Sequence, residues 1–64
     1  MTKETIRDSL GRIIGYYEHM PNGDITVRDF YGTILGYYRK NDDTTRNFHN
    51  VIVARGNCVG MLLR

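Results

Sequence analysis

The sequence predicts an all-β, mainly antiparallel fold, either a small shallow barrel or a curled meander of about six to seven strands. Three observations predict it. A strand–turn–strand unit repeats along the chain, each unit carries the same kind of turn residues, and β-branched or aromatic residues follow each turn. The 64 residues are expected to form a single domain, with internal repeats at approximately 6–26, 27–44 and 45–63.

The repeat is clearest when residues 6–18 are aligned with residues 27–39. Both segments read aliphatic-Arg-Asp-x-x-Gly-x-Ile-aliphatic-Gly-Tyr-Tyr. A third copy, at residues 45–54, keeps the arginine and the aliphatic run but has diverged elsewhere. Repetition of this length does not arise by chance, and it is the strongest signal in the chain.

Each repeat also has the residues of a type I turn that is closed by a left-handed residue. Asp or Asn starts such a turn by bonding its own following backbone, and Gly or Asn accepts the left-handed conformation. The combination predicts a hairpin with a bulge after the turn. The three pairs are Asp8 with Gly11, Asp29 with Gly32, and Asn47 with Asn50.

Short turns also separate the repeats, at residues 20–24, 40–43 and 55–57. The strands are therefore expected near residues 3–8, 11–19, 24–29, 32–40, 43–47 and 50–55. The tail, residues 58–63, is too short for periodicity to decide between a seventh strand and a short apolar helix.

Both faces of the central strands are expected to be apolar. Alternation with period two places Ile13, Gly15 and Tyr17 on one face, with Ile14 and Tyr16 on the other. The second repeat follows the same rule, with Ile34, Gly36 and Tyr38 opposed to Leu35 and Tyr37. One face is the core, and the second would be a subunit interface, a lined channel or a cover for the tail.

A small residue recurs in each repeat where something approaches the backbone closely. Its neighbour is either an aromatic ring from an adjacent strand, or a ligand or narrow central channel. The candidate interface or channel residues are Gly15, Tyr16, Gly36, Tyr37 and Ala54.

Arg7, Arg28 and Arg46 occupy the same place in the three repeats. They form a candidate anion-binding stripe, because guanidinium groups hold phosphate or carboxylate in a bidentate way. Alternatively each arginine pairs with a nearby acid, such as Asp8, Asp29 or Glu18, and covers apolar surface with its stem.

No catalytic or metal-binding constellation is recognisable. His19, His49 and Cys58 lack zinc-type spacing, and neither Cys58 nor Ser9 has an evident base. The tyrosine pairs could stack bases or sugars, but adjacent strand residues face opposite ways, so packing in a core or interface is the simpler interpretation. We therefore expect no enzyme activity, no cofactor and no metal.

The composition indicates a soluble cytoplasmic protein that self-associates. The net charge of +2 is spread along the chain, so no nucleic-acid partner is expected. A single cysteine and the lack of a signal-like N-terminus favour a reducing compartment, and no apolar run is long enough to span a membrane. So short a chain buries a small core, which favours a homo-oligomer or a protein partner.

The iterated pattern Arg-Asp-x-x-Gly-Arg-Ile-Ile-Gly-Tyr-Tyr, followed by Val-Ala-Arg-Gly-Asn and a small apolar tail, resembles the bacterial and phage "4-fold beta flower" proteins. The resemblance covers about Ile6 to Leu63, and departs from the pattern at Asn47 and Asn50. It implies hairpins around a central apolar channel, with the tail as a short helix or plug and the small residues lining the channel. It implies no activity and no site residues. The Tyr-Asp repeats of large secreted toxins are somewhat similar, but they come in long arrays.

The function expected from the sequence is a non-enzymatic binding or assembly module that meets its partner through strand edges or the second apolar face. The alternative is a small-molecule or anion-binding domain that uses the channel mouth and the arginine stripe.

Overall fold

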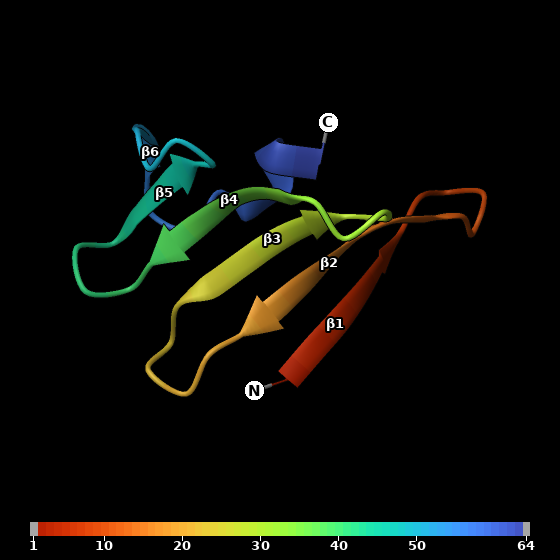
Figure 1. The fold of residues 1–64 in the computed structure, drawn as a ribbon, viewed down its shortest axis with the longest axis horizontal. Helices are drawn as coiled ribbons and strands as arrows, with labels where there is room; N and C mark the ends of the chain where they lie inside the picture. Colours follow the sequence, from red (N-terminus) through yellow and green to blue (C-terminus); the bar gives the residue numbers. More distant parts are fainter. Residues whose placement is uncertain (1, 64) are drawn as a thin grey trace.

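The computed structural model describes residues 2–63, which form a six-stranded antiparallel sheet whose strands are neighbours in chain order (Figure 1). The elements are β1 (Thr2–Arg7), β2 (Ile13–His19), β3 (Ile25–Asp29), β4 (Ile34–Arg39), β5 (Thr44–Asn47), β6 (Ile52–Arg55) and the 3₁₀ helix η1 (Val59–Leu63). The all-β prediction is confirmed. The sheet is an open meander with free edges at β1 and β6, and the tail is a short helix.

The three repeat turns share one hydrogen-bond pattern. In the first, Gly11 N–H donates to the Asp8 carbonyl at 3.0 Å, and Asp8 Oδ1 accepts the N–H groups of Leu10 and Arg12 at 2.9 and 3.0 Å. Asp29 and Asn47 make the equivalent bonds in the second and third turns. The predicted turn chemistry is therefore confirmed in all three repeats.

The residue that closes each turn is left-handed, as the sequence predicts. Its φ is 81° at Gly11, 89° at Gly32 and 67° at Asn50. Only Gly, or at some cost Asn, accepts this conformation routinely. The third repeat therefore forms the same turn with Asn50 in place of the glycine.

Each hairpin has a one-residue register shift directly after its turn. Ile6 pairs with Gly15 whereas Arg7 pairs with Ile13, so Ile14 is an extra residue in β2. The same shift makes Leu35 the extra residue in β4 and Val53 the extra residue in β6. Such a bulge bends its strand and redirects the side chains beside it.

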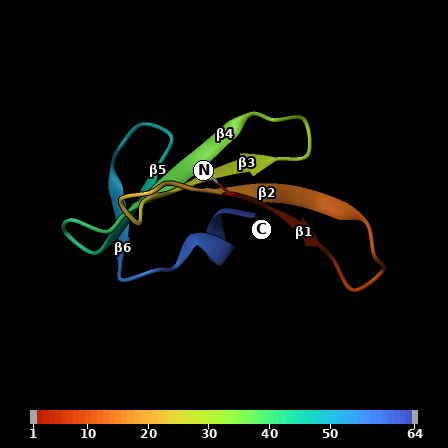
Figure 2. The same ribbon diagram turned by 90° about the horizontal axis from the view of Figure 1, so that it is seen from below.

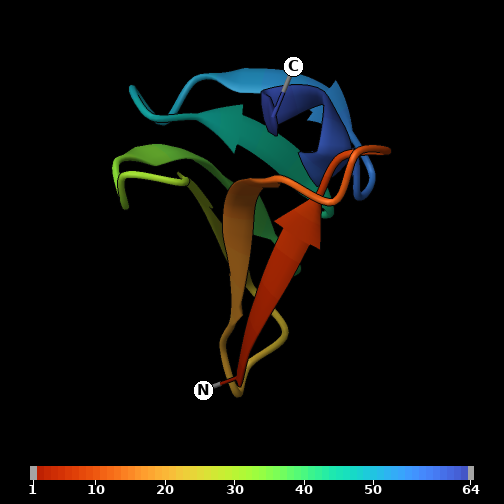
Figure 3. The same ribbon diagram turned by 90° about the vertical axis from the view of Figure 1, so that its right-hand side faces the viewer.

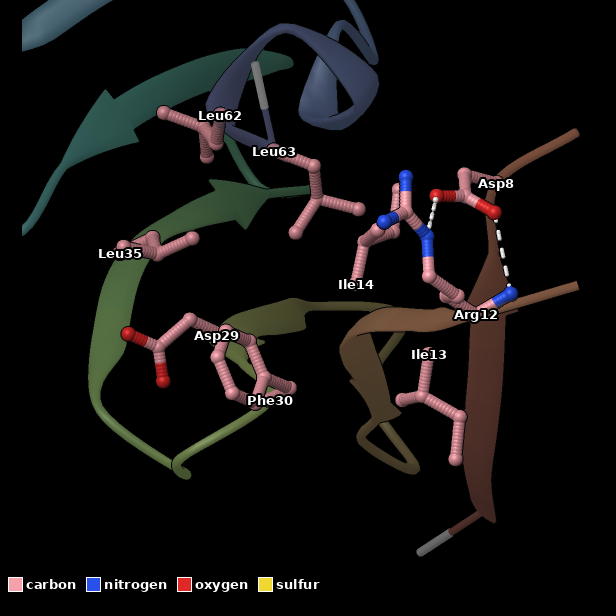
Figure 4. Close-up of a pocket in the computed structure, with 9 residues that line it drawn as sticks. All are labelled: Asp8, Arg12, Ile13, Ile14, Asp29, Phe30, Leu35, Leu62 and Leu63. Atoms are coloured by element: carbon pink, nitrogen blue, oxygen red, sulfur yellow. Dashed lines mark hydrogen bonds and ion pairs between the residues drawn. The ribbon is translucent and has the colours of Figure 1, made fainter. Parts of the chain in front are cut away.

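The bulges change the predicted composition of the two faces. Leu35, expected beside Tyr37, packs instead against the core together with Tyr38. Ile14, expected beside Tyr16, points toward Leu63 of the tail (Figure 4). The predicted allocation of these residues to the two faces is therefore wrong: the register places Ile13 and Ile34 on the face of Tyr16 and Tyr37, because strict alternation does not hold across a bulge.

The sheet curls around η1, which lies against its concave side (Figures 2 and 3). Ile25, Val27 and Val59 are the buried apolar residues of this core among the described residues. Partly buried side chains complete it: Tyr17, Leu35, Tyr38, Leu62 and Leu63. We call this side the covered face and the opposite side the open face.

The tail accounts in part for the small residue that recurs at Gly15 and Gly36 in the first two repeats. A Cβ built on Gly15 would lie 2.5 Å from Leu63 Cδ2, and one on Gly36 would lie 2.8 Å from Leu62 Cδ1. The two Cβ atoms would also clash with the carbonyl oxygens of Arg28 and Arg46, respectively. The close neighbours are therefore leucines of η1 and carbonyl groups of the adjacent strands, and not the aromatic ring expected as one alternative. The concave space where the other alternative places a channel contains η1.

Candidate binding surfaces

The three repeat arginines hold the turns that follow them. Arg7 Nη1 donates to the carbonyl of Gly11 at 2.9 Å, and Arg28 Nη1 donates to that of Gly32 at 2.8 Å. Arg46 makes the equivalent bond to Asn50 at 3.4 Å. Each arginine thus binds the carbonyl of the left-handed residue, which explains why Arg precedes the turn in every repeat.

Two of these arginines also pair with carboxylates. Arg28 Nε donates to Glu18 Oε1, and Arg46 Nη2 donates to Asp42 Oδ2 at 2.6 Å. Arg7 has no carboxylate within 4.0 Å in the described part of the chain. The Glu18 pairing was one alternative drawn from the sequence, whereas Asp8 pairs with Arg12 instead.

The strand register places all three arginines on the open face. Arg28 lies opposite Tyr16 across β2 and β3, and Arg46 lies opposite Tyr37 across β4 and β5. Tyr37 also lies opposite Thr26 on β3. The stripe predicted from the repeat therefore exists as a row on one face, with tyrosines between the arginines.

The open face is strongly basic. Its strand residues include six cationic side chains and one carboxylate, as the pairings across the sheet show. The cations are Lys3, Arg7, Arg28, Arg39, Arg46 and Arg55, and the carboxylate is Glu18. Two loop carboxylates join this face, Asp24 beside Arg39 and Asp42 beside Arg46.

Tyr16 and Tyr37 are both half-buried on the open face, and each has a cation over its ring. Lys3 Nζ lies 4.6 Å from the ring centroid of Tyr16, and Arg39 Cζ lies 5.3 Å from that of Tyr37. Tyr17 and Tyr38, their neighbours in sequence, pack against the core. The expectation that adjacent tyrosines face opposite ways is confirmed.

A groove lies on the covered side between the first two repeat turns (Figure 4). Its volume is about 560 Å³, and it is lined by Ile13, Ile14, Leu35, Leu62, Leu63, Phe30, Asp8, Arg12 and Asp29. Its walls are apolar, and its rim carries the Arg12–Asp8 ion pair at 3.0 Å. The groove can accept a small apolar molecule or an apolar side chain.

The edge strand β6 is apolar and exposed. Val51, Ile52 and Val53 are 56%, 51% and 41% exposed, and β6 has no partner on its outer side in the described sheet. The opposite edge, β1, reads Thr-Lys-Glu-Thr-Ile-Arg and is polar. Ala54, one of the predicted small residues, lies on β6 opposite the fully buried Thr45.

The residues considered for metal or nucleophilic chemistry lie apart. Cys58 is exposed, with its thiol 3.5 Å from the Arg55 carbonyl. His19 contacts Glu4 at 3.0 Å, and His49 stacks on Phe48 at a turn tip. Among residues 2–63, no three His, Cys, Asp or Glu side chains gather in an arrangement that could hold a metal ion.

Among residues 2–63, four side chains have shifted pKa values, and all belong to the scaffold. The hydrogen bond from the backbone N–H of Arg12 lowers the pKa of Asp8. Hydrogen bonds from the Thr44 hydroxyl and from Arg46 lower the pKa of Asp42. Burial raises the pKa of Tyr17. The pKa of Tyr38 is raised mainly because its hydroxyl donates to Asp43 at 2.6 Å.

No helix in the described part of the chain is long and apolar enough to cross a membrane. No protein-family model, curated protein or solved structure matches this chain.

Proposed function

We propose that this chain is a non-enzymatic assembly module that forms homo-oligomers through the exposed edge of β6. The observation that carries the proposal is the run Val51–Val53, whose three apolar side chains are each more than two-fifths exposed on an unpaired edge. A free edge offers backbone donors and acceptors to another strand. A cytoplasmic setting is part of the proposal, because a reducing compartment suits the exposed Cys58 thiol.

The small core supports self-association. Ile25, Val27 and Val59 are the apolar residues buried in it, and domains of this size usually need a further source of stability. Pairing of β6 with a second copy would bury apolar side chains and satisfy edge hydrogen bonds together. The polar β1 edge, which carries Lys3 and Glu4, is protected in the way natural edge strands are.

A second copy suits β6 better than a ligand does. An edge strand recognises another strand through its backbone, and the antiparallel order of this sheet allows β6 to accept one more strand in the same sense. The second copy offers both a matching β6 and a β1 edge. The two arrangements differ in symmetry, since β6 with β6 gives a closed dimer and β6 with β1 gives an open or ring-shaped assembly.

Sedimentation equilibrium over a range of concentrations tests the proposal. We expect masses above the 7.4 kDa of a single chain, and we expect Ile52→Lys to return the protein to that mass. Leu10→Lys is the matched control, because Leu10 is exposed at a turn and lies outside β6. A wild-type protein that stays at the single-chain mass at millimolar concentration would contradict the proposal, as would an Ile52→Lys variant that assembles normally.

Small-molecule binding in the groove is the second candidate, favoured by a volume in the usual range for such sites. Phe30 lines the groove, whereas Phe48, at the same place in the third repeat, does not. The fluorescent probe anilinonaphthalene sulfonate should therefore bind the wild type and Phe48→Ser, and bind Phe30→Ser more weakly. Equal binding to both variants would exclude the groove.

A further inference from the structure

The strands gather cationic side chains on the open face. On the open face, six cations meet Glu18 and the loop carboxylates Asp24 and Asp42, which leaves a net charge of +3. The whole chain carries +2, so the remaining residues are net acidic. Charges that are interspersed along the chain are thus gathered by the fold, because alternation along each strand brings these cations to one side.

Lys3, Arg7 and Arg55 have no carboxylate partner within 4.0 Å among the described residues. Their charge is free to attract an anion. The other three cations keep donors beyond the ones their carboxylates use, since each guanidinium carries five N–H groups. A partner with several regularly spaced negative charges would complement this face.

Aromatic rings stand between these cations. Tyr16 on β2 and Tyr37 on β4 flank β3, two interstrand spacings apart across the sheet and offset by two residues along it, or about 12 Å. Lys3 and Arg39 each cover one face of these rings, so a base that stacks on that face displaces the cation, which stays close to the phosphate of the same nucleotide. Thr26 and Arg28 occupy the strand between the rings.

We infer that the open face binds single-stranded nucleic acid. A positively charged surface that follows the backbone, combined with rings on which bases stack, is the arrangement by which proteins hold single strands without reading their sequence. Duplex offers no free base faces to Tyr16 and Tyr37. A membrane surface would call for a continuous apolar patch on this face, whereas its exposed apolar strand residues, Ile13 and Ile52, lie on β2 and β6 with three strands between them.

Fluorescence anisotropy with a labelled twelve-nucleotide oligothymidine tests the inference. Affinity should fall as salt rises, with a log–log slope of about −3 if roughly four phosphates are neutralised. The double variant Lys3→Gln/Arg39→Gln should bind at least about tenfold more weakly at 0.1 M salt, because two phosphate contacts are lost. The matched control is Arg12→Gln/Lys40→Gln, which removes the same charge outside the open-face strand residues.

The tyrosines distinguish base stacking from general attraction to polyanions. Tyr16→Leu and Tyr37→Leu should each weaken binding about tenfold, whereas Tyr→Phe at either place should not, because Phe keeps the ring. Circular dichroism melting identifies any variant that fails to fold. Absence of oligothymidine binding, equal binding of duplex, heparin or anionic vesicles, or insensitivity to both Tyr→Leu changes would each overturn the inference.

Discussion

The hydroxyl of Thr45 joins the last hairpin to the tail. Thr45 Oγ1 accepts the N–H of Cys58 at 3.0 Å and donates to the carbonyl of Gly56 at 2.8 Å, and the residue is fully buried. Ile6 and Val27 hold the same place in the first two repeats, which are followed by strands and not by a helix. The one polar residue in this row of the repeat therefore stands where the chain must leave the sheet.

Replacement of Thr45 by Val should destabilise the domain by about 1–3 kcal/mol, because the N–H of Cys58 and the carbonyl of Gly56 lose a buried partner. Urea unfolding followed by tyrosine fluorescence measures the change. Thr45→Ser keeps the hydroxyl and should cost less. Equal stability of Thr45→Val and wild type would show that water replaces both bonds.

Arg28 should be important for stability whether or not the open face binds an anion. Its guanidinium bonds both Glu18 and the Gly32 carbonyl, whereas within residues 2–63 the guanidinium of Arg7 bonds the Gly11 carbonyl alone. We expect Arg28→Gln to lower the free energy of unfolding by about 1 kcal/mol or more, and Arg7→Gln to lower it less. Equal losses in denaturant unfolding of the two variants would contradict this ranking.

The turn residues supply a comparison internal to the chain. The side-chain oxygen of Asn47 accepts hydrogen bonds from two backbone N–H groups of its turn, and Asp29 accepts the equivalent two in the second turn. Asp29→Asn should therefore change stability little, whereas Asp29→Ala should cost about 1 kcal/mol through the loss of two hydrogen bonds. Thermal melting of the two variants tests the difference, and a costly Asp29→Asn would indicate that the charge of Asp29 has a separate role.

These comparisons also show which parts of the fold could be predicted from the sequence. The turns were predictable because Asp, Asn and Gly act within four residues, and the third repeat even keeps the turn with Asn50. The faces of Ile14 and Leu35 were not, because a bulge shifts the alternation by one residue. The basic character of the open face depends on the same register, so it could not be predicted from the composition.

The tail was the least predictable element. Its leucines pack against Gly15 and Gly36, which are distant in sequence and come close only through the curl of the sheet. A signal for this contact existed in the recurring small residue, but it did not identify the neighbour. Likewise Thr45 could have been singled out as a polar residue in an aliphatic row of the repeat.

Stability should fall at both ends of the pH range. Asp8 and Asp42 have lowered pKa values in the folded state, so their contribution is present above the ordinary pKa of 3.8 and is lost as pH falls through the lowered values. Tyr17 and Tyr38 have raised pKa values, so folding favours their protonated forms and weakens as pH rises above 10.

Melting temperatures recorded from pH 2 to 11 check both limits, and Tyr38→Phe provides the control at the alkaline end. Since this variant removes one of the two raised tyrosines, its alkaline decline should be shallower than that of the wild type. An unchanged decline would assign the alkaline effect to Tyr17, which is more buried.

The two glycines under the tail allow the strongest test of the covered face. Gly15→Ala would place a methyl group 2.5 Å from Leu63 Cδ2 and 2.5 Å from the Arg28 carbonyl oxygen, and something must move. We expect a loss of about 1–3 kcal/mol or displacement of η1, measured by urea unfolding and by exposure of the tail to carboxypeptidase.

Gly11→Ala separates this clash from backbone strain. Nothing lies within 4 Å of a Cβ at Gly11, so its loss, about 1–2 kcal/mol, arises only from the left-handed φ of 81°. Leu63→Ala should relieve Gly15→Ala in part, because it removes the side-chain clash and leaves the carbonyl of Arg28 in place. It should not relieve Gly11→Ala at all. If Leu63→Ala failed to relieve Gly15→Ala, the recurring glycine would be required by the neighbouring strand and not by the tail.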